Sequence, residues 1–204
     1  MDTKDLIIRK AWYKAAPKDF YGNAIATYTG FFNSLFDLFK FGKWIITPQY
    51  CHQEIGFKVS DVRACLAANP YLEHPALIAK LESCKDDEYI WYSSASRNAD
   101  GTNGTRWISE TDLFKNPERW DVYEMKAIIP LEKMLYICND EIGKAYDWLG
   151  IMGFGTIFGQ VNDKKKWYCS EICKKIFSGK WTKRISPIAS FIEDRPMLLN
   201  KVKI

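Results

Sequence analysis

The chain of 204 residues is 47% hydrophobic and 15% aromatic, and its formal net charge at pH 7 is +4. That length and hydrophobic content predict one substantial packed domain and exclude a globally disordered chain. The basic residues are scattered along the sequence, so the small positive charge predicts no nucleic-acid partner.

Cysteines and histidines limit the metal and redox chemistry that the chain can carry. No two of the six cysteines form a CxxC pair, and there are only two histidines. Because structural zinc sites usually need closely spaced ligand pairs, we expect no metal and no other cofactor. We expect reduced thiols for all the cysteines, which stand at positions 51, 65, 84, 138, 169 and 173.

The N-terminal sequence does not have the features of a targeting segment. Residues 1–5 include acidic side chains and only a short apolar run follows them, so no signal peptide is expected. No segment reaches the roughly 18 consecutive apolar residues that a transmembrane helix needs. These features predict a cytoplasmic location.

The first part of the chain leaves two questions open. Residues 6–12 fit either a strand or a short helix. The aromatic residues within 24–40 are typical of a helix that faces a core. A helix at a membrane surface is the less favoured interpretation of this segment, because its polar face is not rich in Lys or Arg.

Residues 50–59 alternate as a strand does. Alternation places His52, Glu54 and Gly56 on one face and the apolar residues around them on the other. Residues 60–84 then predict a helix that Ser60 or Asp61 caps, with breaks at its two prolines.

The remaining elements follow in order along the chain. Residues 88–94 predict a strand, 98–104 a turn-rich loop, 105–108 a strand that pairs back as a hairpin, and 111–119 a polar connection. A strand over 120–129, a helix over 131–146, a glycine-rich loop over 148–160 and an irregular or short helical tail from 185 complete the chain. Strands in the middle with helices on either side predict an α+β domain.

One cysteine lies where helix geometry favours a nucleophile. The segment 167–177 has helical apolar spacing and a stop at Gly179, so Cys169 falls in the first turn. Unpaired backbone N–H groups and the positive end of the helix dipole favour a thiolate there. Because free cysteines are often simply buried, the alternative is a core residue.

A cysteine nucleophile needs a base, and the sequence offers two candidates. His52 lies on the predicted strand with Glu54 two residues on, whereas His74 lies between Glu73 and Pro75 and is predicted to be a surface residue. A histidine on a strand that faces a cysteine at a helix start is the arrangement of papain-like catalysis.

The order of these motifs resembles the circularly permuted NlpC/papain-like cysteine amidase superfamily, in particular its YiiX-like and phage-type members. Tyr-Cys-His-Gln-Glu-Ile-Gly-Phe at 50–57 comes early, and Trp-Tyr-Cys-Ser-Glu-Ile-Cys at 167–173 comes late. Tyr-Ser-Ser at 92–94 with Arg106, the stretch 143–150 and Ile-Ser-Pro at 185–187 are similar to further family segments. The resemblance covers about residues 44–190, with 1–43 as an N-terminal extension of a single domain.

The resemblance implies a fold and a set of roles. The fold is a permuted papain-like domain, an antiparallel sheet packed against helices with the nucleophile at a helix N-terminus. Cys169 is the nucleophile, His52 the general base, and Tyr146 helps to bind the oxyanion. The group that orients the imidazole, or otherwise contacts the substrate, remains open among Glu54, Ser93 and Ser94.

Two neighbours of Cys169 have less specific predictions. Cys173 shares its helix face and fits either a resolving thiol or, as the favoured interpretation, a core residue. Glu171 lies on a different face of the helix and is predicted to interact with the dipole of the first turn.

The resemblance implies a cysteine hydrolase that cleaves an amide or peptide bond, with cell-wall peptide of peptidoglycan as the suggested substrate. One alternative is a lipid acyltransferase or thioesterase of the lecithin:retinol acyltransferase kind, which would contact membranes. Another is a catalytically degenerate binding module or a structural part of a phage virion. The phage-type members add the virion to the cytoplasm as an expected location.

Overall fold

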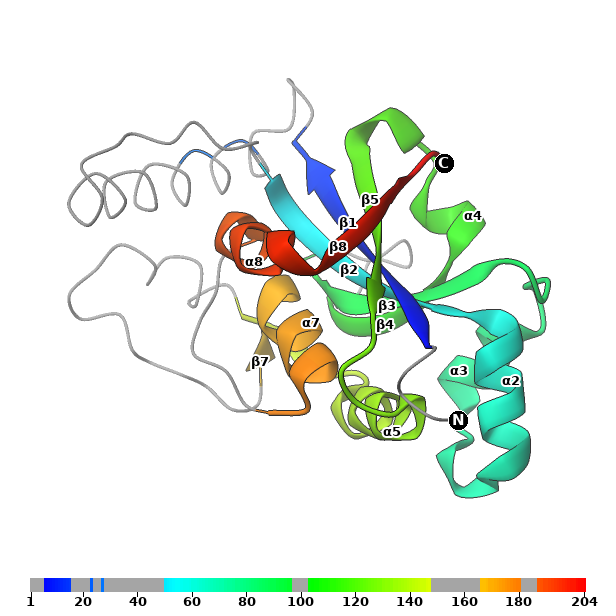
Figure 1. The fold of residues 1–204 in the computed structure, drawn as a ribbon. Coiled ribbons are helices and arrows are strands. Elements are labelled where there is room, and N and C mark those ends of the chain that lie inside the picture. Colours follow the sequence, from blue (N-terminus) through cyan, green and yellow to red (C-terminus); the bar gives the residue numbers. More distant parts are fainter. Residues whose placement is uncertain are drawn as a thin grey trace.

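The computed structural model describes residues 6–15, 23, 27, 50–96, 103–147, 166–180 and 187–204. At its centre is a six-stranded antiparallel sheet in the order β4-β3-β2-β1-β5-β8 (Figure 1). The strands are β1 (Ile7–Lys14), β2 (Tyr50–Lys58), β3 (Tyr89–Ala95), β4 (Gly104–Ser109), β5 (Trp120–Lys126) and β8 (Leu198–Val202). A small parallel pair joins β6 (Ala145–Tyr146) to β7 (Lys166–Trp167).

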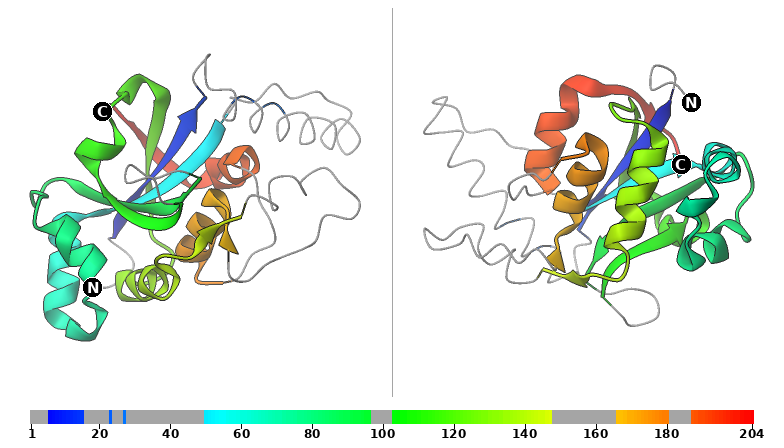
Figure 2. Two further views of the ribbon diagram at one scale, coloured as in Figure 1. Left: turned by 180° about the vertical axis from the view of Figure 1, so that it is seen from behind. Right: turned by 90° about the horizontal axis from the view of Figure 1, so that it is seen from below.

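Helices lie on both faces of this sheet. α5 (Leu131–Glu141), α7 (Cys169–Ser178) and α8 (Pro187–Asp194) lie together along one face (Figure 2). α4 (Glu110–Leu113) packs beside β3 and β4, while α2 (Val59–Ala68) and α3 (Pro75–Leu81) follow directly after β2. Three short 3₁₀ turns complete the described elements, at Pro70–Leu72, Pro117–Arg119 and Arg195–Met197. The predicted α+β class is confirmed.

Alternation along the strands produces two cores of unequal size. The larger core lies under α5, α7 and α8, and there Trp12, Ile55 and Tyr92 point from three neighbouring strands toward the helices. The smaller core lies on the opposite face, where Trp91 packs edge-on against Phe114 with ring centroids 5.1 Å apart. The side-chain period of two therefore sends neighbouring residues of a strand to different cores, as it does for Trp91 and Tyr92 of β3.

Most of the predicted strands are confirmed, and the structure shows which of the two alternatives for residues 6–12 is correct. Residues 6–12 belong to strand β1, which pairs with both β2 and β5 and so lies in the middle of the sheet. The β3–β4 hairpin is also present as predicted. The predicted helix at 24–40, apart from Thr27, and the predicted loop at 148–160 lie outside the described residues.

Four predictions about the bounds or caps of elements are wrong. Neither Ser60 nor Asp61 caps α2, because β2 runs straight into it, and the N–H groups of Val59 and Ser60 bind the carbonyls of Glu88 and Asp86. The predicted helix 131–146 ends at Glu141, after which the chain becomes β6. The tail contains the edge strand β8, and part of the connection 111–119 belongs to α4.

Candidate active site at the fork between β2 and β3

The two central strands β2 and β3 pair over only part of their length. Their register runs from Lys58↔Tyr89 to Ile55↔Tyr92 and stops there. Residues 50–54 of β2 and 93–95 of β3 then separate, and we call these diverging segments the fork. At the base of the fork the Ser93 hydroxyl donates to the Gln53 carbonyl over 2.6 Å.

Helix α7 begins at this fork. The Cys173 Sγ lies 3.6 Å from the Gln53 carbonyl oxygen, 3.9 Å from that of Tyr92 and 3.8 Å from the Ser93 hydroxyl. One thiol of α7 therefore contacts the diverging parts of both strands. Burial raises the pKa of Cys173 to about 12, so this thiol is neutral and packs in the interior, in line with the core interpretation.

The sequence of α7 explains why the helix starts at Cys169. Tyr168 is extended, and its backbone N–H donates to the Glu171 carboxylate over 3.2 Å. The first bond within the helix runs from the Ile172 N–H to the Tyr168 carbonyl, so the Cys169 N–H is not used inside the helix. Gly179, with φ of 67°, ends the helix as predicted.

Cys169 is fully enclosed at this helix start. It packs with Tyr146 and Tyr168 and is 0% exposed. Burial raises the pKa of its thiol well above the ordinary value of 9, and the neighbouring Cys173 adds to the rise, while a hydrogen bond with the Gln53 backbone acts in the other direction. The predicted thiolate is therefore wrong for this structure, because desolvation outweighs the helix terminus.

A β-bulge in β2 lies beside this thiol. Tyr13 of β1 pairs with His52 and Lys14 with Tyr50, which leaves Cys51 as the extra residue. The Cys51 thiol contacts the Tyr13 carbonyl at 3.7 Å. Bulges bend a strand and redirect its side chains, and this one shifts the alternation just before His52.

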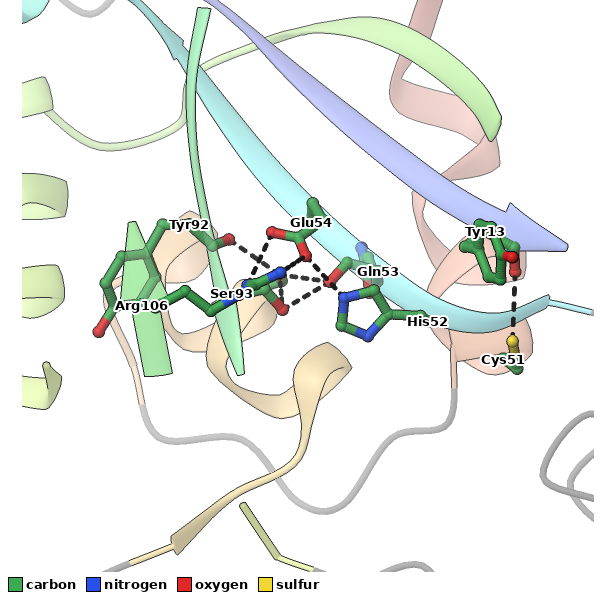
Figure 3. A network of polar contacts seen from close by, with 9 residues as sticks. Tyr13, Cys51, His52, Gln53, Glu54, Tyr92, Ser93 and Arg106 are labelled. Carbon is green, nitrogen blue, oxygen red and sulfur yellow. Dashed lines mark hydrogen bonds and ion pairs between the residues drawn. The ribbon is translucent and has the colours of Figure 1, made fainter. Parts of the chain in front are cut away.

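His52, Glu54 and Arg106 form a chain of polar contacts at the fork (Figure 3). The His52 Nε2 and the Glu54 Oε1 are 2.6 Å apart. Arg106 on β4 binds the same carboxylate through both oxygens, with Nη2 at 2.6 Å from Oε1 and Nη1 at 3.2 Å from Oε2. Of the three candidates for the group that orients the imidazole, Glu54 is the one in contact with His52.

The carboxylate in this chain is completely buried, while its partners are partly open. Glu54 has a side-chain exposure of 0%, against 19% for His52 and 18% for Arg106. Burial alone would raise the pKa of Glu54, but the Arg106 guanidinium and then His52 hold it below its ordinary value of 4.5. Glu54 is therefore an ionised group inside the protein, and it can only accept hydrogen bonds.

The two other candidates for the orienting group have different partners. Ser93 donates to the Gln53 carbonyl, and Ser94 donates to the Trp167 carbonyl over 2.8 Å. Both serines are fully buried, and their hydroxyls bond to these carbonyls and not to His52. The Ser93 hydroxyl joins β3 to β2 at the base of the fork, and the Ser94 hydroxyl joins β3 to β7.

The predicted oxyanion residue does lie beside the cysteine. Tyr146 belongs to β6, and its ring packs against Tyr168 at 5.8 Å between centroids and against Cys169. Burial raises the pKa of its phenol well above the ordinary value, and the nearby Cys169 adds to the effect. Tyr146 is therefore a neutral hydroxyl next to the thiol.

Cys169 meets β2 one residue from His52, without a direct bond to the imidazole. Cys169 is hydrogen-bonded to the Gln53 backbone, one peptide unit from His52. Among the contacts of the described residues, none joins the imidazole to this thiol. The second histidine, His74, is half-buried and caps α3, with its Nδ1 accepting from the Ala76 N–H.

Three residues near His52 had no predicted role. Arg106 contributed to the family resemblance but was given no role, although the predicted hairpin register could have placed it opposite Ser93. Trp120 packs edge-on to the imidazole at 6.1 Å, and Tyr13 packs on Trp120 at 5.0 Å. No sequence signal linked these aromatics to His52, because β1 and β5 meet only in the folded sheet.

Comparison with known proteins provides no further assignment. No family model matches the sequence, and no curated protein and no solved structure matches it either. Within the described ranges, no helix is long and apolar enough to cross a membrane, and no cluster of three or more His, Cys, Asp or Glu could hold a metal ion.

Proposed function

We propose that this protein is a cysteine hydrolase of the permuted papain-like kind, acting on an amide or peptide bond. In this proposal Cys169 is the nucleophile, His52 is the general base, and Glu54 orients the base. The main observation in support of this proposal is that the cysteine, the histidine and the carboxylate all lie at the fork. A cysteine that starts a helix meets the strand backbone one residue from a histidine, and that histidine is bound to an ionised carboxylate.

The hydrogen bond from His52 to Glu54 leaves one ring nitrogen for the cysteine. Glu54 can only accept, so the neutral imidazole carries its hydrogen on Nε2. The other nitrogen, Nδ1, then has a free lone pair and points away from Glu54 (Figure 3). This is the tautomer that a base needs to take the proton of a thiol.

The reaction then proceeds with two proton transfers for each bond that is broken. Nδ1 takes the Cys169 proton as the sulfur bonds to the carbonyl carbon, and the imidazolium returns that proton to the leaving nitrogen as the C–N bond breaks. Water, activated by the same nitrogen, hydrolyses the thioester and restores the thiol. The N–H of Cys169, which makes no bond within the helix, and the Tyr146 hydroxyl are the proposed donors to the oxyanion.

The neutral resting thiol makes the base essential. Because the pKa of Cys169 is raised, few molecules carry a thiolate near neutral pH, and attack requires removal of the proton during the step. The family resemblance suggests cell-wall peptide as the substrate.

The complete burial of Cys169 favours a second candidate, a binding or structural module on the same scaffold. In that case the thiol packs against Tyr146 and Tyr168 and never meets a substrate. One experiment separates the two functions.

The test is acyl-enzyme formation with a small activated ester, p-nitrophenyl acetate, at pH 7. The hydrolase predicts an acetyl thioester on Cys169 by mass spectrometry, formed at least about 100-fold more slowly in His52→Gln. Cys173→Ser is the matched control, since it removes the buried thiol one turn later and should keep the label. No adduct on Cys169, or equal rates with and without His52, would contradict the hydrolase and support the binding module.

A further inference from the structure

Arg106 is the one cation in contact with the His52–Glu54 pair among the described residues, and it reaches the pair from a different hairpin. It extends from β4 over Ser93 of β3 and places two N–H groups on the two oxygens of Glu54 (Figure 3). Oε1 therefore accepts from Arg106 and from His52 at the same time, each over 2.6 Å. Bidentate binding of this kind fixes both the position and the charge of a carboxylate.

Resting on the proposed function, we propose that Arg106 is a positioning residue. It keeps Glu54 ionised and thereby sets which nitrogen of His52 carries the hydrogen and which has the free lone pair.

The proposal follows from the two forms that a buried carboxyl group can take. An ionised Glu54 only accepts, so Nε2 must be the donor and Nδ1 the base. A protonated Glu54 could donate its own hydrogen to Nε2, and the imidazole would then carry its hydrogen on Nδ1. In that tautomer Nδ1 has no lone pair for the Cys169 proton.

Full burial makes the arginine necessary for the ionised form. Desolvation favours the neutral carboxyl, and the Arg106 charge is the largest of the influences that oppose it. Without Arg106, the His52–Glu54 pair would hold its last proton to a higher pH, whether that proton lies on the carboxyl or on the imidazole. In both cases the pH at which the pair loses this proton moves upward, because the two groups titrate as a pair.

The other groups near the imidazole do not replace this charge. Tyr13 pairs with His52 across β1, Trp120 on β5 packs on the ring, and neither carries a charge. Cys51 precedes His52 in the bulge and contacts the Tyr13 carbonyl, and Cys169, whose thiol is neutral, bonds to the Gln53 backbone. Among the described residues, Arg106 is therefore the cation that contacts the His52–Glu54 pair.

The test is a pH titration of the two histidines by NMR in a Cys169→Ser background, so that its outcome does not depend on catalysis. Assignment uses His74→Gln, which leaves only His52. The proposal predicts that Arg106→Gln moves the midpoint at which the pair loses its proton upward by about one pH unit or more. Arg106→Lys keeps the charge but not the bidentate geometry and should give a smaller shift.

An unchanged midpoint in folded Arg106→Gln would overturn the proposal, with the His74 signal reporting that the fold is intact. A second measurement does not need this variant to fold. The imidazole ¹⁵N shifts of the unsubstituted chain above the midpoint should show hydrogen on Nε2 of His52, and hydrogen on Nδ1 would overturn the proposal equally.

The two proposals can fail separately. If Arg106 acts as proposed but Cys169 is not acetylated, the proposed hydrolase function is wrong. The contacts of Arg106 with Glu54 and His52 then fix the protonation of the pair without serving a reaction. If acetylation occurs and the midpoint does not move, the hydrolase stands and Arg106 is structural. When both hold, the acid limb of the acetylation rate in Arg106→Gln moves to higher pH along with the midpoint.

Discussion

Two buried ion pairs lie on opposite faces of the sheet at neighbouring register positions. Lys10 pairs in register with Ile55 and points into the helix-covered core, whereas Ala11 pairs with Glu54, which points to the other face. Both acids, Asp194 and Glu54, are fully buried. The difference lies in what surrounds them.

The Lys10 pair is closed on every side. Its Nζ lies 2.7 Å from the Asp194 Oδ2, both side chains are 0% exposed, and the ammonium sits 4.3 Å from the centre of the Phe177 ring. Ser190 adds a hydrogen bond to the same carboxylate over 3.3 Å. This pair joins β1 to α7 and α8, and no part of it meets solvent.

The Glu54 pair instead ends in a histidine that is partly open. His52 retains 19% side-chain exposure and a nitrogen that Glu54 does not use. The same interaction type therefore serves two purposes. The closed pair holds three elements together, and the open pair holds a histidine one residue from the backbone that bonds to Cys169. Burial of a charge alone does not suggest a functional site, whereas an oriented, partly exposed group beside it makes one a candidate.

The largest expected effect on stability is on the closed pair. Lys10→Met leaves the buried Asp194 with the more distant Lys174 at 3.7 Å, and we expect the free energy of unfolding to fall by about 3–5 kcal/mol. Urea unfolding measures this loss. In the matched double variant Lys10→Met/Asp194→Leu most of the loss should disappear, because no charge is left unpaired. An equally large loss in the double variant would mean that packing, and not charge, is responsible.

The open pair should contribute less to stability and more to reactivity. Glu54→Gln leaves a partly exposed Arg106 that water can reach, so we expect a loss of about 1–3 kcal/mol. The acetylation rate of Cys169 should fall by roughly 10–100-fold, since Gln can no longer hold the imidazole tautomer. A variant that loses stability but keeps its rate would show that the pair is purely structural, like that of Lys10.

The smallest expected effect is on the pH dependence of the free energy of unfolding. The folded-state pKa of Glu54 lies below its ordinary value of 4.5, so its ion pairs add stability above that pH and lose it as the pH falls through the folded value. The stability difference between the unsubstituted chain and Glu54→Gln should therefore narrow below about pH 4.5. Urea titrations at pH 7 and pH 3 measure it, and a difference that widens in acid would contradict the ionised state of Glu54.

The sequence predicted the local elements well because their signals are local. The strand 50–59, the hairpin of β3 and β4 and the start of α7 near Cys169 all depend on alternation, helical spacing and a glycine stop. Strand β8 was missed, because five residues with mixed polarity gain their strand character only from pairing with β5.

The sequence suggested the members of the candidate site but not their electrostatics. Chain order and the family resemblance suggested Cys169, His52 and Tyr146, and in the structure Cys169 packs on Tyr146 and bonds to the backbone one residue from His52. The sequence could not decide between Glu54 and the serines, nor assign Arg106 a role, because those contacts depend on how β2 and β3 diverge. The predicted thiolate failed for a related reason, since helix position is visible in a sequence and desolvation is not.

The most direct test is the rate of alkylation of Cys169 by iodoacetamide between pH 5 and pH 10, located by mass spectrometry, in the unsubstituted chain and in His52→Gln. The pKa of the thiol is raised, so an unassisted Cys169 should stay inert until strongly alkaline pH. The account predicts labelling near neutral pH that is lost in His52→Gln and retained in His74→Gln. Labelling that begins only at alkaline pH in all three proteins would contradict the claim that His52 activates Cys169.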